Sequence, residues 1–113
     1  MQRRWHFSVR SKVWLELNGE PVFGEGRKRL LLAIDRFGSI SRAASEVGIS
    51  YRRAWSYLRA MEVQLGVKLV EAQRGGEHGG GARLTENARV LIKEFEKLLA
   101  GMGDLGPEAQ RFF

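Results

Sequence analysis

The chain has 113 residues, with 19 Lys and Arg against 13 Asp and Glu, so its formal net charge is +6. This length fits a single domain over residues 1–113, and the lack of cysteine excludes disulfides, iron–sulfur clusters and thiolate zinc sites. No apolar run reaches the roughly 18 residues of a membrane span, and the N-terminus lacks the apolar core of a signal peptide. We therefore expect a cytoplasmic protein whose basic excess favours a polyanionic partner.

The first element predicted along the chain is an N-terminal β-hairpin over residues 9–23. Apolar residues alternate with polar ones toward the end of the segment Val9–Leu17, which is the period of a half-buried strand. Asn18-Gly19 is a common two-residue hairpin turn. Pro21-Val22-Phe23 then forms the return strand, with its proline at an edge.

Three helices are predicted next, over residues 27–37, 42–47 and 51–65, from the three- and four-residue spacing of their apolar side chains. A glycine that suits a C-terminal cap follows each helix: Gly38, Gly48 and Gly66. A serine that suits an N-terminal cap precedes the second and the third: Ser39 or Ser41, and Ser50.

The second and third of these helices form a predicted helix-turn-helix over residues 41–65. Ala43-Ala44 allows the two helices to approach closely, and Gly48 provides the turn.

One stripe of the third helix is apolar: Ala54, Leu58, Met61 and Leu65. The opposite face is mainly basic and polar: Arg52, Ser56, Arg59 and Val63, with Arg53 at its border. A helix with one anchored and one basic face suits the major groove of DNA, because arginine recognises guanine through two parallel hydrogen bonds. The alternative is a solvated basic face without a partner.

Two aromatic residues flank this basic face. Tyr51 lies in the first helical turn, where we expect it to contact DNA. Trp55 lies about 100° round the helix from Ala54, between core and surface. We expect Trp55 to pack partly against the core or the first helix, with contact to the sugar-phosphate edge as the alternative.

A second β-hairpin is predicted over residues 67–84. Candidate strands flank the segment 74–81, which has five glycines in eight residues. A hairpin after a helix-turn-helix is a wing, from which Arg74, His78 and Arg83 can contact phosphates. A nucleotide-binding loop is not favoured, because no Gly-Lys-Ser/Thr ending follows the glycines. A plain flexible loop remains the alternative.

The last predicted helix spans residues 86–100, with Thr85 as its cap. Its apolar stripe is the candidate dimerisation surface: Ala88, Leu91, Ile92, Phe95, Leu98 and Leu99. Burial of the same stripe within one subunit explains the spacing equally well. Both interpretations stay open at this point.

Three motifs together resemble a known family: Gly38–Ala44, Gly48–Trp55 and the glycine-rich segment with Leu84-Thr85. They are similar to the winged helix-turn-helix of the LysR-type regulators and, more closely, to the DNA-binding domain of the molybdate-responsive regulators (ModE family). The resemblance covers about residues 24–100. It implies a mainly α fold with a small β part, and a homodimer that binds double-stranded DNA and regulates transcription in bacteria or archaea. Genes for molybdenum or other metal oxyanions are the implied targets.

Members of that family also carry C-terminal oxyanion-binding modules, for which a chain ending at Phe113 has no room. We therefore expect a stand-alone DNA-binding member without a cofactor or metal, regulated otherwise or paired with a separate effector-sensing partner. The candidate DNA-binding residues lie on the helix-turn-helix and the wing: Ser41, Arg42, Ser50, Tyr51, Arg52, Arg53, Ser56, Arg59, Arg74, Gly75, Gly76, His78 and Arg83.

Two other functions were weighed against DNA binding. A winged helix can use the same surfaces as a protein-interaction module, and the N-terminal hairpin could add an edge strand to a partner. An enzyme is not expected, because the two histidines, His6 and His78, lie in a tail and a glycine-rich loop, where neither is held as a base.

Overall fold

The computed structural model describes residues 3–73 and 81–102. Its elements follow the chain in this order: β1 (Trp14–Leu17), β2 (Glu20–Gly24), α1 (Glu25–Phe37), α2 (Ile40–Val47), α3 (Tyr51–Leu65), β3 (Val70–Gln73), β4 (Gly81–Leu84) and α4 (Glu86–Met102). The two antiparallel hairpins form separate two-stranded sheets. Among the described residues, no helix is both long and apolar enough to cross a membrane.

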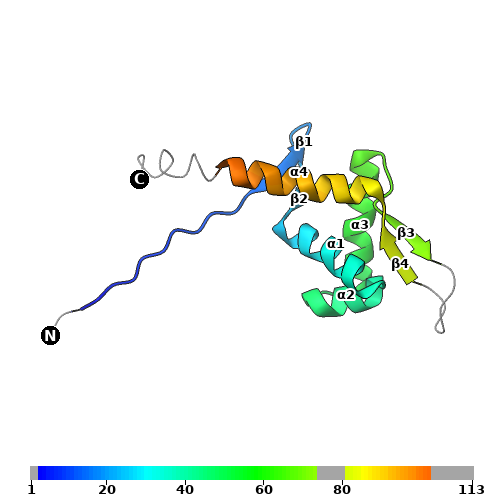
Figure 1. The fold of residues 1–113 in the computed structure, drawn as a ribbon, viewed down its shortest axis with the longest axis horizontal. Coiled ribbons are helices and arrows are strands. Elements are labelled where there is room, and N and C mark those ends of the chain that lie inside the picture. The colour runs from blue at the N-terminus through cyan, green and yellow to red at the C-terminus, as the bar shows by residue number, and fades with distance from the viewer. Residues whose placement is uncertain (1–2, 74–80, 103–113) are drawn as a thin grey trace.

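The helices form the body of the molecule, and the two hairpins lie at different places on its edge (Figure 1). The β3–β4 hairpin extends beside α2 and α3, and β1–β2 lies close to the middle of α4. Phe23 of β2 meets Phe95 of α4 edge-to-face, with ring centroids 5.3 Å apart and both rings buried. Arg89 of α4 donates hydrogen bonds of 3.2 and 2.8 Å to the two carboxylate oxygens of Asp35 in α1. These hydrogen bonds and the negative charge of Asp35 raise the pKa of Arg89, so this contact between α1 and α4 keeps its charged donor.

The helix-turn-helix forms as the sequence predicts. The Ser50 hydroxyl accepts the backbone N–H of Arg53 at 3.0 Å, which caps α3. Of the two candidate caps for α2, the structure selects Ser39, whose hydroxyl accepts the N–H of Arg42 at 3.2 Å. Gly48 ends α2 with φ of 80°, a left-handed conformation that costs glycine little and other residues more.

The N-terminal hairpin is shorter on its first strand than the predicted 9–23. Its turn is confirmed, since Asn18 and Gly19 have φ of 53° and 83°. The first strand begins at Trp14 rather than Val9, because Trp14 pairs with Gly24, the last residue of β2. The chain enters α1 directly after Gly24, so no strand residue remains to pair with residues 9–13. For the same reason α1 begins at Glu25, two residues before the predicted start.

The wing also begins later than predicted. The sequence pattern places a strand from residue 67, whereas β3 starts at Val70. The N–H groups of Leu69 and Val70 both donate to the carboxylate oxygen Oε2 of Glu62 in α3, at 2.8 and 3.3 Å. Leu69 is fully buried. This segment is therefore attached to α3 before the ladder with β4 begins.

The apolar stripe of α4 divides between the core and the surface. Ala88, Ile92 and Phe95 are buried in the core of their own chain, which favours the alternative of burial within one subunit for this face. Leu91 and Leu99 are partly buried against the same core, and Leu98 is 52% exposed. The periodicity of the stripe reflects packing within the chain, and only its edge is left for another molecule.

Candidate nucleic-acid interface

The basic face of α3 lies on the surface as the helical spacing predicts. Ala54 and Leu58 are buried beneath it, and Arg52 and Arg59 are exposed on the opposite side. Ser56 and Arg53 are exposed as well. The ion pairs found among the described residues join Lys28 to Glu25, Arg83 to Glu71 and Arg89 to Asp35. Within the described chain the cations of α3 thus have no carboxylate partner, and they are free to meet phosphates or base edges.

A groove of about 460 Å³ runs between the start of α2, α3 and the strands of the wing. Ser41, Tyr51, Trp55, Arg59 and Lys68 contribute to its lining. Its walls therefore offer hydroxyl, aromatic and cationic groups on one side of the α3 basic face. Among these residues, the sequence analysis does not identify Lys68 as a candidate. The alternation of apolar and polar residues around it predicts only a strand.

Tyr51 and Trp55 form a pair in this groove. Their rings meet edge-to-face, with centroids 6.3 Å apart. Trp55 is 45% exposed, so the rest of its surface is covered by its own chain and a large part of the ring stays available to another molecule. The two rings form an exposed aromatic surface at the start of α3. Arg59 follows Trp55 by one helical turn.

The start of α2 brings further polar groups to the same surface. Ser41 and Arg42 are exposed, and the Arg42 guanidinium lies 5.3 Å from the ring centroid of Phe37. Stacking on an aromatic ring fixes a guanidinium while leaving its N–H groups available. The unpaired backbone N–H groups at a helix N-terminus also favour anions. This end of α2 can therefore contact a phosphate.

The two strands of the wing supply one described cation, and several other candidates of the wing are residues that the structure does not describe. Arg83 of β4 lies opposite Glu71 of β3, and its Nε and Nη2 donate to Glu71 Oε2 at 3.3 and 3.2 Å. The predicted phosphate contact of Arg83 thus competes with a carboxylate on the neighbouring strand. The other wing candidates lie outside the described residues: Arg74, Gly75, Gly76 and His78.

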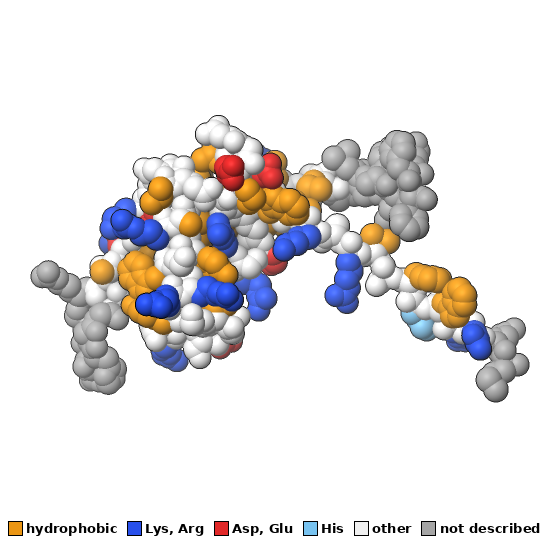
Figure 2. All heavy atoms as spheres, turned by 180° about the vertical axis from the view of Figure 1, so that it is seen from behind, with side chains coloured by type: hydrophobic (Ala, Val, Ile, Leu, Met, Phe, Trp, Pro, Cys, Tyr) orange, Lys and Arg blue, Asp and Glu red, His pale blue; other side chains and the backbone are white. Residues whose placement is uncertain are grey.

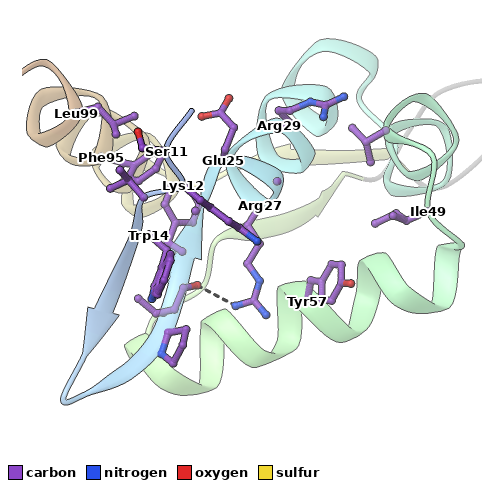
Figure 3. Close-up of a pocket in the computed structure, with 17 residues that line it drawn as sticks. Ser11, Lys12, Trp14, Glu25, Arg27, Arg29, Ile49, Tyr57, Phe95 and Leu99 are labelled. Atoms are coloured by element: carbon purple, nitrogen blue, oxygen red, sulfur yellow. Dashed lines mark hydrogen bonds between the residues drawn. The ribbon is translucent and has the colours of Figure 1, made fainter. Parts of the chain in front are cut away.

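A larger pocket of about 800 Å³ lies on another side of α3, between the β1–β2 hairpin, the start of α1 and α4 (Figure 3). Arg27 crosses it: its guanidinium donates to the Val22 carbonyl at 2.9 Å and lies 5.2 Å from the ring centroid of Tyr57. Arg27 therefore links the hairpin to α3. The described residues hold no cluster of three or more His, Asp or Glu side chains suited to a metal ion.

Comparison with known proteins agrees with this geometry. Residues 27–89 match the family model "Bacterial regulatory helix-turn-helix protein, lysR family". "Molybdenum-pterin-binding protein MopB" of Rhodobacter capsulatus is 46% identical over 93 residues, which are 82% of this chain and 34% of that protein. "DNA-binding transcriptional dual regulator ModE" of Escherichia coli K12 is 39% identical over 80 residues, 70% of this chain and 30% of that protein. The chain therefore spans about a third of the length of these relatives.

Solved structures show the same fold. The crystal structure of the CbnR DNA-binding domain in complex with DNA matches with a TM-score of 0.54 and 22% identity, over 75% of this chain and 92% of that chain. Fold and surface together define a winged helix-turn-helix of the DNA-binding transcription regulators. The chain belongs to the lysR family of bacterial regulatory helix-turn-helix proteins. This membership agrees with the expectation that the protein is not an enzyme, and it favours DNA over the protein-interaction alternative.

Proposed function

We propose that the chain binds double-stranded DNA sequence-specifically, as a homodimer, and so regulates transcription. The observation that carries the proposal is the pair of exposed arginines on α3, Arg52 and Arg59, opposite the buried Ala54 and Leu58. A helix held by one face can lay the other face in the major groove. There each guanidinium can form two parallel hydrogen bonds with a guanine.

The groove beside α3 supports the same placement. Ser41 and Lys68 line it from α2 and from the start of the wing. Phosphate contacts of this kind fix the orientation of a protein on the duplex, whereas base contacts provide specificity. We assign Arg52, Ser56 and Arg59 to base edges. The flanking candidates serve the backbone: Ser41, Arg42, Ser50, Tyr51, Arg53, Arg74, Gly75, Gly76, His78 and Arg83.

The proposed homodimer would use the exposed edge of the α4 stripe. Leu98 and Met102 are 52% and 43% exposed, and Leu91 and Leu99 are only partly covered by their own chain. Pairing two copies of α4 would bury this edge. A twofold dimer would then meet a near-palindromic site, with half-sites about 34–36 Å apart or a multiple of that distance.

The names of the relatives suggest the regulated genes. MopB is named a molybdenum-pterin-binding protein. The relatives called ModE are named a molybdenum transport protein in one case and a DNA-binding transcriptional dual regulator in another. We therefore propose that this chain acts in the cytoplasm on genes of molybdenum or other metal-oxyanion metabolism. Chromatin immunoprecipitation from the source organism would test this target class directly.

Selection of bound duplexes from a random DNA pool tests the central proposal. A symmetric motif is the expected outcome. Against the selected site, Arg52→Ala or Arg59→Ala should cost about 1–3 kcal/mol and relax the preference at one position of each half-site. Lys97→Ala, on the exposed side of α4, removes the same charge and is the matched control.

Two outcomes would contradict the proposal. Unchanged binding by both α3 variants would show that another face recognises the bases. No duplex binding at low salt, together with a stable complex with another protein, would instead support the interaction-module alternative, since DNA affinity that depends on phosphate contacts is greatest at low salt.

A further inference from the structure

The N-terminal segment of residues 3–12 concentrates positive charge. It carries four cations, Arg3, Arg4, Arg10 and Lys12, and the first carboxylate of the chain is Glu16. The segment alone thus contributes +4, where the whole chain has a net charge of +6. Neither the helix-turn-helix nor the wing explains this charge.

The structure leaves this segment fully accessible. Every residue from Arg3 to Lys12 is exposed and lies in no helix or strand. The segment runs away from the body as an extended chain (Figure 1). The ion pairs among the described residues involve none of its cations. No described carboxylate therefore neutralises these four charges.

The cations continue a basic surface of the body. Figure 2 shows Lys and Arg side chains gathered over one face of the folded part, with few Asp or Glu side chains among them. In the same view the extended segment leaves the side of that face and carries more cations along its length. A polyanion bound across this face would pass close to the root of the segment.

The length of the segment matches DNA beyond the area under the body. Ten extended residues span at most about 33–36 Å. Ten base pairs of duplex rise about 34 Å at 3.4 Å each. The segment can therefore follow the backbone for about one further helical turn.

The order of side chains gives the extended segment two different sides. In an extended chain, alternate residues point to opposite sides, so Arg4, Arg10 and Lys12 share one side. Trp5 and Phe7 share the other side with Arg3; the two rings are 71% and 84% exposed and meet edge-to-face. The cationic side suits phosphates, while the rings on the other side can pack on the sugar edges of the groove.

We propose that residues 3–12 bind the phosphate backbone of the DNA that flanks the site contacted by α3. This inference rests on the proposed function, because it requires α3 to place the body on a duplex. It adds a contact that carries no sequence information. The segment would raise affinity and salt dependence without changing the preferred site.

The test uses the full chain, its selected site and two lengths of duplex. One duplex contains only the symmetric site, and the other extends it by ten base pairs on each side. The variant Arg4→Gln/Arg10→Gln is compared with Lys93→Gln/Lys97→Gln, which removes the same two charges from α4. Affinity is measured against salt concentration for each protein on each duplex.

On the long duplex, wild type and the α4 variant should show the steeper salt dependence. The Arg4→Gln/Arg10→Gln variant should lose about 0.9 in the slope of log affinity against log salt for every phosphate contact removed. On the short duplex the three proteins should have similar slopes. The selected motif should be the same for all of them.

If all three proteins show the same salt dependence on the long duplex, the inference is wrong. The proposed function would still stand in that case, provided that wild type binds the site. Sedimentation equilibrium gives a second check: if Arg4→Gln/Arg10→Gln dissociates the dimer, the segment is a subunit contact and the inference is wrong. Failure of wild type to bind any duplex would instead reject the proposed function itself.

Discussion

The carboxylate oxygen Oε2 of Glu62 accepts the backbone N–H of Leu69 at 2.8 Å and so attaches the start of the wing to α3. The same oxygen accepts the N–H of Val70 at 3.3 Å. Glu62 lies three residues beyond Arg59 on the same helix, and it also lines the groove between α3 and the wing. This side chain therefore helps to set the distance between the two parts of the proposed DNA-binding surface.

Glu62→Ala should lower the free energy of unfolding by about 1–3 kcal/mol, because the N–H groups of Leu69 and Val70 lose their acceptor. Urea denaturation measures the change. Glu94→Ala is the control, since Glu94 is exposed on α4 and alanine fits a helix equally well. An equal, small loss in both variants would show that the contact contributes nothing to stability.

The turn of the helix-turn-helix offers a matched pair of glycine substitutions. Gly48→Ala should cost about 1–2 kcal/mol, because φ of 80° is a left-handed backbone conformation that L side chains rarely adopt, even though the added Cβ would meet no other group within 4 Å. Gly26→Ala should be neutral or stabilise by up to about 1 kcal/mol, since its Cβ would meet nothing within 4 Å in α1. Thermal unfolding compares the two. A stabilised Gly48→Ala protein would refute the strained turn.

Glu71→Gln should strengthen binding to all duplexes, whatever their sequence. The substitution removes the ion-pair partner of Arg83 and one negative charge from the wing. The salt dependence should become steeper because one more cation is available. Glu94→Gln changes the net charge equally at a distance from the wing. If the two variants bind alike, Arg83 does not contact DNA.

Two residues of α4 separate the core from the proposed dimer contact. Phe95→Ala should destabilise the fold by about 3–5 kcal/mol, because it opens a cavity against Phe23. Leu98→Glu should leave the far-ultraviolet circular dichroism unchanged but weaken self-association, since Leu98 is half exposed. Sedimentation equilibrium shows the difference. A Leu98→Glu protein that associates as wild type does would exclude this edge of α4 from the dimer.

The helices were predictable because their ends are encoded locally. Ser50 caps α3 through an N–H three residues away, and Gly48 ends α2 by its own backbone conformation. The basic face of α3 followed from the same helical period. No partner from a distant segment is needed for any of these features, so the sequence alone was sufficient.

The strands were less predictable because each needs a partner. Alternation from Val9 indicates a strand, but β2 ends at Gly24 and cannot pair with residues 9–13. β3 begins only at Val70, where the N–H groups of Leu69 and Val70 donate to the carboxylate of Glu62 in α3. The α4 stripe shows a related limit: periodicity reveals which side chains are buried, not which chain covers them. The groove at Ser41 and Lys68 likewise joins segments that no local pattern connects.

The root of the wing is held from a second direction as well. Ala82 donates its N–H to the carbonyl of Gly38 at the end of α1, at 2.8 Å, and Thr85 donates its N–H to Leu69 at 2.9 Å. The described backbone of β3 and β4 is therefore positioned against both α1 and α3 by hydrogen bonds within the chain. Binding to DNA would then restrict the side-chain rotamers of β3 and β4 more than their backbone torsions. The loss of conformational entropy on binding is therefore small for a hairpin at the surface.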